Sequence, residues 1–332
     1  VAQPGLSINT GDHTGTLEEK IGRFSKVKDE VHRALPWADL AIAGGHTDPD
    51  IVRVCEALGF EGLWGFCWEQ IEVDQITDRG CPWGHYYLNP DDRLRPAVGR
   101  SLVALEWTAR DLLKSYHSKN PCLYGTDPND VARGGICLWE NIDYLKGLAD
   151  NYHRNTRYND QVFLLQHQEA HEMERHEGWL CYTEEDIQES AVMLREFVKY
   201  LQPKATFLTL AETVRAYRQH NEHTASSYML FEDTHHPRPN PDYNFSTCFG
   251  PWPRTFFYYD RGVQLVFVEG QVNPVCLRNY GRPWDNVHFY QEPVIPRVRL
   301  VHNTQYVWSR EIEFTIDSPH AMPYGVALWG DF

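Results

Sequence analysis

The feature that most constrains the fold of this 332-residue chain is an alternation of short apolar runs with longer amphipathic segments. The short runs have the composition of β-strands and cover Leu6–Thr10, Leu40–Gly44, Gly62–Phe66, Leu102–Glu106, Cys122–Gly125, Val162–Gln166 and Ala205–Leu210. The clearest helical patterns between them cover Leu17–Leu35, Pro49–Leu58, Trp139–Tyr152 and Glu184–Leu201. This order predicts an α/β fold, as a parallel sheet or a barrel built from βα units.

The pattern changes after the polar stretch 219–227, where helical periodicity stops. The segments that follow are rich in β-branched and aromatic residues and cover Thr255–Asp260, Val263–Glu269, Arg297–His302, Glu311–Asp317 and Tyr324–Trp329. Glu311–Asp317 alternates strictly between polar and apolar residues, which is typical of a half-buried antiparallel strand. We therefore expect an α/β domain over residues 1–222 and an antiparallel β domain, sandwich-like or a β-extension, over residues 223–332.

Charge and motif content exclude several classes of function. The 46 acidic and 31 basic side chains give a formal net charge of −15, which repels nucleic acids and anionic membrane surfaces. No run approaches the roughly 18 apolar residues of a membrane helix. Glycine-rich phosphate loops and the Gly-x-Ser-x-Gly motif are also absent from the sequence. We expect neither nucleic acid nor membrane as a partner, and neither a nucleotide-dependent enzyme nor an α/β serine hydrolase.

The eight cysteines are spread singly, without a Cys-x-x-Cys pair. Such spacing predicts reduced, mostly buried thiols and argues against a structural zinc knuckle. Reduced thiols favour a cytoplasmic location. A secreted protein is the alternative if a signal peptide has been removed upstream of Val1.

Acidic and histidine residues follow nearly every predicted strand, where the loops of parallel α/β folds gather functional side chains. After the first two strands these are Asp12, His13, His46 and Asp48, which are candidate ligands for a divalent, zinc-type metal. Asp48 precedes a proline, so a helix N-cap is the alternative interpretation of this residue.

The densest group follows the strand Val162–Gln166 and consists of His167, Glu169 and His171. If the chain is helical there, the two histidines share one face and could bind a metal, with Glu169 as acid or base. If the chain is extended, all three side chains fall on one side of a strand. Solvated polar residues at a helix start are the alternative.

A second group combines carboxylates with aromatic rings. Glu69 follows the strand Gly62–Phe66, and Glu106 ends the strand Leu102–Glu106, with Arg110 four residues on as a potential neutralising partner. Aromatic rings can seat a sugar while their polar atoms reach its hydroxyls. The candidate substrate-binding residues near these carboxylates are Trp68, Gln70, Asp74, Trp83, Tyr86 and Tyr87. An aromatic-rich core is the alternative for a chain with 11 Trp, 18 Tyr and 15 Phe.

The stretch from Val162 to Glu212 resembles the closing portion of polysaccharide deacetylases. It contains a strand ending in Leu-Leu-x-His, a helix with Met193-Leu194-x-x-Phe197, and the segment Ala205–Glu212. Residues 57–87 look like other members of the same glycoside hydrolase/deacetylase superfamily. The resemblance implies an irregular seven-stranded β/α barrel, hence a (β/α)7-type barrel followed by the antiparallel β domain. It also implies a catalytic role for His167.

Two motifs of that family are missing. Deacetylases open with a strand carrying two adjacent aspartates and then present a His-Ser/Thr-x-x-His motif; here Asp12-His13 and His46-Thr47-Asp48 stand in those places. In a deacetylase mechanism His46, His167 and His171, with Asp12 or Asp48, would hold the metal that activates water.

The expected function is that of a carbohydrate-active hydrolase acting on a glycosidic bond or an acyl group. In a glycosidase, Glu69 with Glu106 or Glu169 would be acid and base or nucleophile. The alternative is a non-catalytic carbohydrate-binding protein on a degenerate deacetylase-like barrel.

Overall fold

A computed structural model places helices together with a mixed sheet, so the chain has an α/β fold. It describes residues 6–7, 14–44, 50–66, 84–91, 96–97, 99–106, 108–117, 124–126, 141–166, 184–232, 255–260, 265–270, 297–306, 310–317 and 325–327. The helices are α1 (Leu17–Ala34), α2 (Ile51–Ala57), α3 (Leu112–His117), α5 (Ile142–Arg154), α7 (Glu184–Leu201) and α8 (Leu210–His220), with a 3₁₀-helix at Asn155–Arg157. Among the described residues, no helix has the length and apolar content needed to span a membrane.

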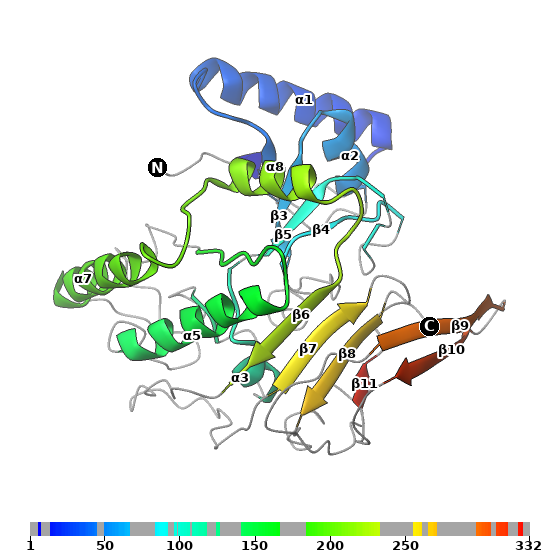
Figure 1. Cartoon of the computed structure of the whole chain (residues 1–332). Coiled ribbons are helices and arrows are strands. Elements are labelled where there is room, and N and C mark those ends of the chain that lie inside the picture. The colour runs from blue at the N-terminus through cyan, green and yellow to red at the C-terminus, as the bar shows by residue number, and fades with distance from the viewer. Residues whose placement is uncertain are drawn as a thin grey trace.

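A five-stranded sheet forms the centre of the first half of the chain (Figure 1). Its order is β1 (Leu6–Ser7), β2 (Ile42–Gly44), β3 (Gly62–Phe66), β5 (Val103–Glu106) and β4 (Tyr86–Tyr87). The first four are parallel and β4 is antiparallel to β5. The carboxyl ends of β1, β2, β3 and β5 therefore lie along one edge, which we call the carboxyl edge.

Helices cover both faces of this sheet because its strands alternate apolar side chains between the two faces. On one face Leu63 and Ala104 join a buried cluster with Ile51 and Cys55 of α2. On the other face Val103 joins a cluster that includes residues of α8. A Cβ atom on Gly62 would lie 2.8 Å from Val214 Cγ2, so α8 can pack this closely only against glycine.

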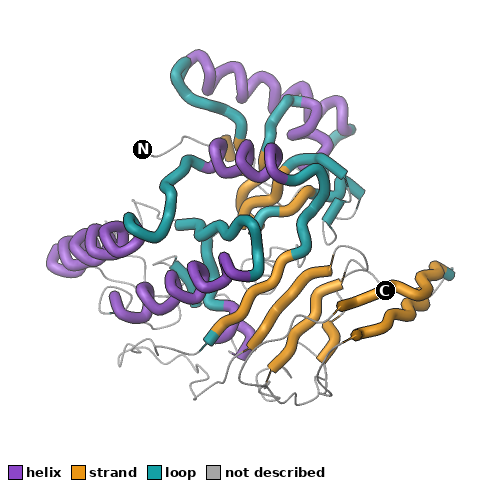
Figure 2. Tube along the Cα trace, viewed as in Figure 1, coloured by secondary structure: helices purple, strands orange, loops and turns teal. Residues whose placement is uncertain are grey.

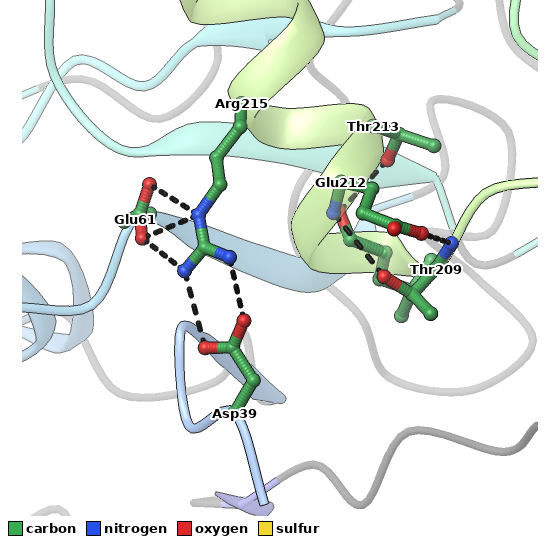
Figure 3. Close-up of polar contacts among 7 residues, drawn as sticks. Asp39, Glu61, Thr209, Glu212, Thr213 and Arg215 are labelled. Carbon is green, nitrogen blue, oxygen red and sulfur yellow. Dashed lines mark hydrogen bonds and ion pairs between the residues drawn. The ribbon is translucent and has the colours of Figure 1, made fainter.

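The opposite edge of the sheet is held by ion pairs around Arg215 of α8 (Figure 3). Its guanidinium group donates to Asp39 Oδ2 at 2.6 Å and to Glu61 Oε1 at 2.7 Å. The two carboxylates precede β2 and β3. The same helix begins with a capping box, in which Thr209 Oγ1 accepts from the Glu212 backbone N–H and Glu212 Oε2 accepts from the Thr209 N–H.

After α8 the described elements are strands, drawn orange in Figure 2, and they pair antiparallel. One sheet has the order β11 (Gly325–Ala327), β8 (Leu265–Gly270), β7 (Thr255–Asp260) and β6 (Ser227–Phe231). A separate ribbon pairs β9 (Arg297–Gln305) with β10 (Arg310–Asp317). Among described elements, the change from α/β to β order falls between α8 and β6; the division into two domains stays a prediction.

Two predicted strands, Val162–Gln166 and Ala205–Leu210, are not strands in the structure, and a third, Cys122–Gly125, is described only at its last two residues. Val162–Gln166 is irregular, because the Leu165 carbonyl accepts from the Ala109 N–H and the Thr126 hydroxyl instead of joining a ladder. In 205–210 the capping box starts α8 at Leu210, so this segment leads into a helix that the sequence analysis missed. In Cys122–Gly125, only Gly125 is described as paired, in an isolated bridge with Arg110.

Candidate active site at the carboxyl edge

Glu106 lies at the carboxyl edge, as the last residue of β5. Its side chain is buried, with 6% of its surface exposed, and Oε1 accepts a hydrogen bond from the Gly84 backbone N–H at 2.9 Å. Its backbone is in register with Phe66, the last residue of β3. Glu106 is therefore a buried carboxylate at the position where parallel α/β folds place functional groups.

Beyond Glu106, three segments that are distant in sequence meet through backbone hydrogen bonds. The Ala109 N–H donates to Leu165 O at 2.9 Å, and the Thr126 N–H donates to Ala109 O at 3.0 Å. The Asp111 N–H donates to Tyr124 O at 2.9 Å. We call residues 108–111, 124–126 and 165–166 the strand-end junction. It joins segments that lie at or just beyond the ends of three predicted strands, Leu102–Glu106, Cys122–Gly125 and Val162–Gln166.

Hydroxyl and amide groups tie the junction together further. Thr108 Oγ1 lies 2.7 Å from Thr126 Oγ1, which also donates to Leu165 O at 3.0 Å. Gln166 Nε2 donates to Thr126 O at 2.8 Å, while Gln166 itself is exposed. This bond fixes the side chain that directly precedes His167 in the sequence.

The junction requires glycine at position 125. A Cβ atom there would lie 2.7 Å from Ala109 O, a distance that a real Cβ does not tolerate from a backbone atom. Gly125 thus permits the close approach of the two segments.

Charged groups are concentrated in the junction and next to it. Arg110, Asp111 and Lys114 are 1–3% exposed. Asp111 accepts from the Lys114 backbone N–H at 3.0 Å and lies 3.4 Å from Lys114 Nζ. With Glu106 the group has two acidic and two basic residues, so their formal charges cancel. Buried charge is costly unless it is paired, and its concentration at a carboxyl edge is characteristic of functional sites.

Two tyrosines of α5 pack next to these buried charged residues. The Tyr152 hydroxyl accepts from the Arg110 N–H at 3.0 Å and donates to Arg110 O at 2.9 Å. The Tyr144 ring lies 5.5 Å from Lys114 Nζ. Burial, and secondarily the negative charge of Asp111, raise the pKa of Tyr144 well above its ordinary value. Tyr144 is therefore a neutral phenol at physiological pH.

Most of the residues predicted from sequence lie outside the described residues. These are Asp12, His13, His46, Asp48, Trp68, Glu69, Gln70, Asp74, Trp83, His167, Glu169 and His171. Their described neighbours are the ends of the carboxyl-edge segments: Ser7, Gly44, Phe66, Gly84 and Gln166. The roles assigned to these residues stay predictions.

Tyr86 and Tyr87 have a packing role instead of the expected contact with substrate. They are 2% and 0% exposed, because β4 places one ring in each of the clusters on the two sheet faces. The Tyr87 hydroxyl donates to Asn221 O at 2.6 Å. Neither ring offers an open face to a sugar.

The metal prediction is not tested by the described residues. Among them, no group of three or more His, Cys, Asp or Glu side chains could hold a metal ion. All proposed ligands fall outside those ranges.

Several residues of the site could not be recognised from the sequence. Lys114, Thr108 and Thr126 carry no motif; the one available signal is the Asp-x-x-Lys spacing of Asp111 and Lys114, which brings two side chains together on one helical turn.

Comparison of the chain with protein-family models, curated proteins and solved structures finds no match.

Proposed function

We propose that the chain is a carbohydrate-active hydrolase whose active site lies at the carboxyl edge of the five-stranded sheet. The observation that carries the proposal is Glu106, a buried carboxylate at the end of β5, next to the strand-end junction. The proposal includes the finer architecture, a (β/α)7-type barrel followed by an antiparallel β domain over residues 223–332, and membership of the glycoside hydrolase/deacetylase superfamily.

In the glycosidase form of the proposal, Glu106 is one of two carboxylates. The other is Glu69, which follows Phe66 by three residues, and Phe66 is the register partner of Glu106. One carboxyl group protonates the leaving oxygen and the other acts as base or nucleophile. The bond from the Gly84 N–H to Oε1 holds the Glu106 carboxyl in one orientation, which such proton transfer requires.

In the deacetylase form, a divalent metal held by His46, His167 and His171 with Asp12 or Asp48 would lower the pKa of a bound water. Imidazole and carboxylate groups are a suitable donor set for a zinc-type ion. The described ends that precede these residues in the sequence are Ser7, Gly44 and Gln166. The buried positive charges of Arg110 and Lys114 would favour an acyl oxyanion nearby.

The two forms are separated by measuring products. Purified protein is incubated with acetylated and plain oligosaccharides, with and without chelator, and released acetate and reducing ends are quantified. Acetate release that chelator abolishes supports the deacetylase; reducing ends that chelator leaves unchanged support the glycosidase. Metal content of the purified protein is measured in parallel.

The variant Glu106→Gln tests whether the buried carboxylate takes part in catalysis, and Glu30→Gln, at an exposed position, is the matched control. We expect the first variant to lose roughly 10²–10⁴-fold in kcat, the usual effect of removing an acid–base group, and the second to keep full activity. Unchanged kcat in Glu106→Gln would remove this residue from the mechanism. Sugar binding without turnover of any glycan would replace the hydrolase by the non-catalytic carbohydrate-binding protein.

A further inference from the structure

A cavity of about 210 Å³ includes in its lining Gly84 and Tyr152, which bond Glu106 and Arg110 of the proposed site. Its walls come from residues 84–85, 158–163, 220–221 and 225–229, with Tyr152 and Tyr217. Two of these residues also belong to the proposed active site. Gly84 donates its N–H to Glu106, and the Tyr152 hydroxyl bonds the backbone of Arg110. The cavity and the site therefore share parts of one wall.

Stacked rings form one side of the cavity. The His85 and Phe163 rings are parallel within 3°, with centroids 3.8 Å apart. Tyr217 meets both edge-on, at 5.8 Å from His85 and 6.4 Å from Phe163. Flat aromatic surfaces of this kind pack against the apolar faces of small ligands.

Polar atoms in the same wall lack partners within the described protein. Both ring nitrogens of His85, which is 7% exposed, and Ser227 Oγ are buried and have no hydrogen-bond partner among the described residues. Buried polar groups are almost always paired, so such exceptions call for an explanation. Three of them belong to residues that line one cavity, so a ligand bound there could supply their partners.

The chemistry of the wall selects the kind of ligand. Burial lowers the pKa of His85 to about 3, so the ring is neutral and presents one donor and one acceptor. Ser227 Oγ can also donate and accept. A hydroxyl group complements both, whereas an anion could only accept and an ammonium ion could only donate. No Lys or Arg is among the described lining residues, and Asp160 lies on the rim, which disfavours anions.

The size of the cavity limits the ligand further. The cavity volume is about 210 Å³. This volume suits one sugar ring with its hydroxyls and is below the roughly 300–1,000 Å³ of sites for larger ligands.

We propose that this cavity is a subsite for a single ring of a neutral sugar, with Phe163 as its aromatic surface and His85 and Ser227 as its hydroxyl contacts. Only the class of ligand, a sugar, rests on the proposed function. A ring held here would place the adjoining part of a saccharide near Gly84 and Glu106.

Equilibrium binding tests this subsite without turnover. Glucose, galactose and N-acetylglucosamine are titrated into the full chain by calorimetry, with inorganic phosphate and glycerol as comparison probes. At least one sugar should bind more tightly than either comparison probe. The Kd of this sugar should rise about three- to tenfold in Ser227→Ala, the usual effect of losing one hydrogen bond. The matched control is Ser101→Ala, whose serine bonds Glu56 away from the cavity.

His85→Phe tests the subsite by two measurements, stability and sugar affinity, which should not fall together. The ring stack is kept and two unpaired buried nitrogens are removed, so the unliganded protein should become as stable as wild type or more stable. Its sugar affinity should nevertheless fall at least threefold. A histidine with a purely structural role would give lower stability with unchanged affinity. That result, or no sugar binding more tightly than phosphate and glycerol, would overturn the subsite.

Hydrogen exchange of the wild-type protein adds a measurement that needs no variant. The bound sugar should slow exchange in residues 84–85 and 225–229, and unchanged exchange at saturating sugar contradicts the proposal. If the protein hydrolyses glycans but the sugar Kd is unchanged in both Ser227→Ala and His85→Phe, the subsite is rejected and the proposed hydrolase function stands. Sugar binding that depends on both residues, without turnover, would reject the hydrolase and keep the subsite.

Discussion

Asn155 bonds both polar backbone groups of Leu230, as a neighbouring strand would. Its Nδ2 donates to Leu230 O at 2.9 Å and its Oδ1 accepts from the Leu230 N–H at 2.7 Å. Asn151 does the same to Glu232, at 3.0 and 3.1 Å, and Asn159 to Tyr228, at 2.6 and 2.9 Å. These three asparagines, which we call the asparagine ladder, pair the outer edge of β6.

The asparagine ladder can form because the rise of four helical residues nearly equals the rise of two strand residues. Four helical residues rise about 6 Å, and two strand residues about 6.8 Å. The 3₁₀ geometry at Asn155–Arg157 lengthens the helical repeat, since its rise is about 2 Å per residue. A helix and an edge strand can thus bond in register at three successive asparagines. These bonds join the α/β half of the chain to the antiparallel sheet.

Replacing Asn155 by leucine should therefore destabilise the protein strongly. The side chain is fully buried, and its loss leaves the N–H and C=O of Leu230 without partners. At about 1–3 kcal/mol for each orphaned group, we expect the free energy of unfolding to fall by roughly 2–4 kcal/mol in urea denaturation. Exposed Thr156→Ala is the control and should change it by less than about 0.5 kcal/mol. A similarly small effect of Asn155→Leu would contradict the ladder.

The elements that could be predicted from sequence are those whose own pattern decides their structure. Gly62–Phe66, Glu184–Leu201 and Thr255–Asp260 are found with the predicted bounds. Segment 205–210 failed because the prediction followed its β-type composition and not the Thr209-x-x-Glu212 spacing, which is the capping box that starts α8 at Leu210. Val162–Gln166 failed because contacts with segments 40–57 residues away fix its conformation.

Arg215 should stabilise the protein in a manner that depends on pH and salt. Its hydrogen bonds lower the pKa of Asp39 below the usual value of 3.8. A lowered carboxyl pKa contributes stability above that value and loses it as pH falls through the pKa in the folded state. Because Arg215 and Asp39 are about half exposed, Arg215→Ala should cost only about 1 kcal/mol at pH 7.

The measurement is urea denaturation of Arg215→Ala and wild type at pH 7 and pH 3, in low salt and in 1 M salt. The difference in the free energy of unfolding should shrink at pH 3 and in high salt. Arg215→Lys should recover only part of it, because lysine keeps the positive charge but lacks the bidentate geometry of the guanidinium group. Exposed Arg157→Ala controls for net charge. A difference independent of pH and salt would show that Arg215 acts through packing alone.

Cys55 should be inert towards alkylation in the folded protein. It is fully buried in the cluster under α2, and burial raises its pKa to about 12, so almost no thiolate forms at pH 8. Iodoacetamide followed by peptide mass spectrometry should leave Cys55 unmodified under native conditions and modify it fully in guanidinium chloride. Equal labelling rates in both conditions would place this thiol at the surface.

The candidate site was predictable in position but not in its detailed composition. Glu106 could be identified because it ends an apolar strand, and strand ends converge at one edge by geometry. Arg110 and Lys114 could not be recognised as buried, because nothing in the local sequence shows that segments 124–126 and 165–166 cover them. Gly125 lets the chain approach Ala109 and the Arg110 side chain closely, which contributes to the burial of Arg110.

His85 should make the protein sensitive to acid. Burial holds its pKa near 3, whereas an unfolded histidine titrates near 6.5, so only the unfolded state takes up the proton between these values. Above pH 6.5 the ring is neutral in both states and its titration leaves stability unchanged; below pH 6.5 the free energy of unfolding falls by about 1.4 kcal/mol per pH unit, until the folded-state pKa is reached. Urea denaturation of wild type and His85→Phe from pH 7 to pH 4 measures this slope. The variant should lose less stability on acidification, while His153→Phe, at an exposed position, controls for removal of an imidazole. Parallel slopes for wild type and His85→Phe would mean that the buried ring takes up its proton in the folded protein.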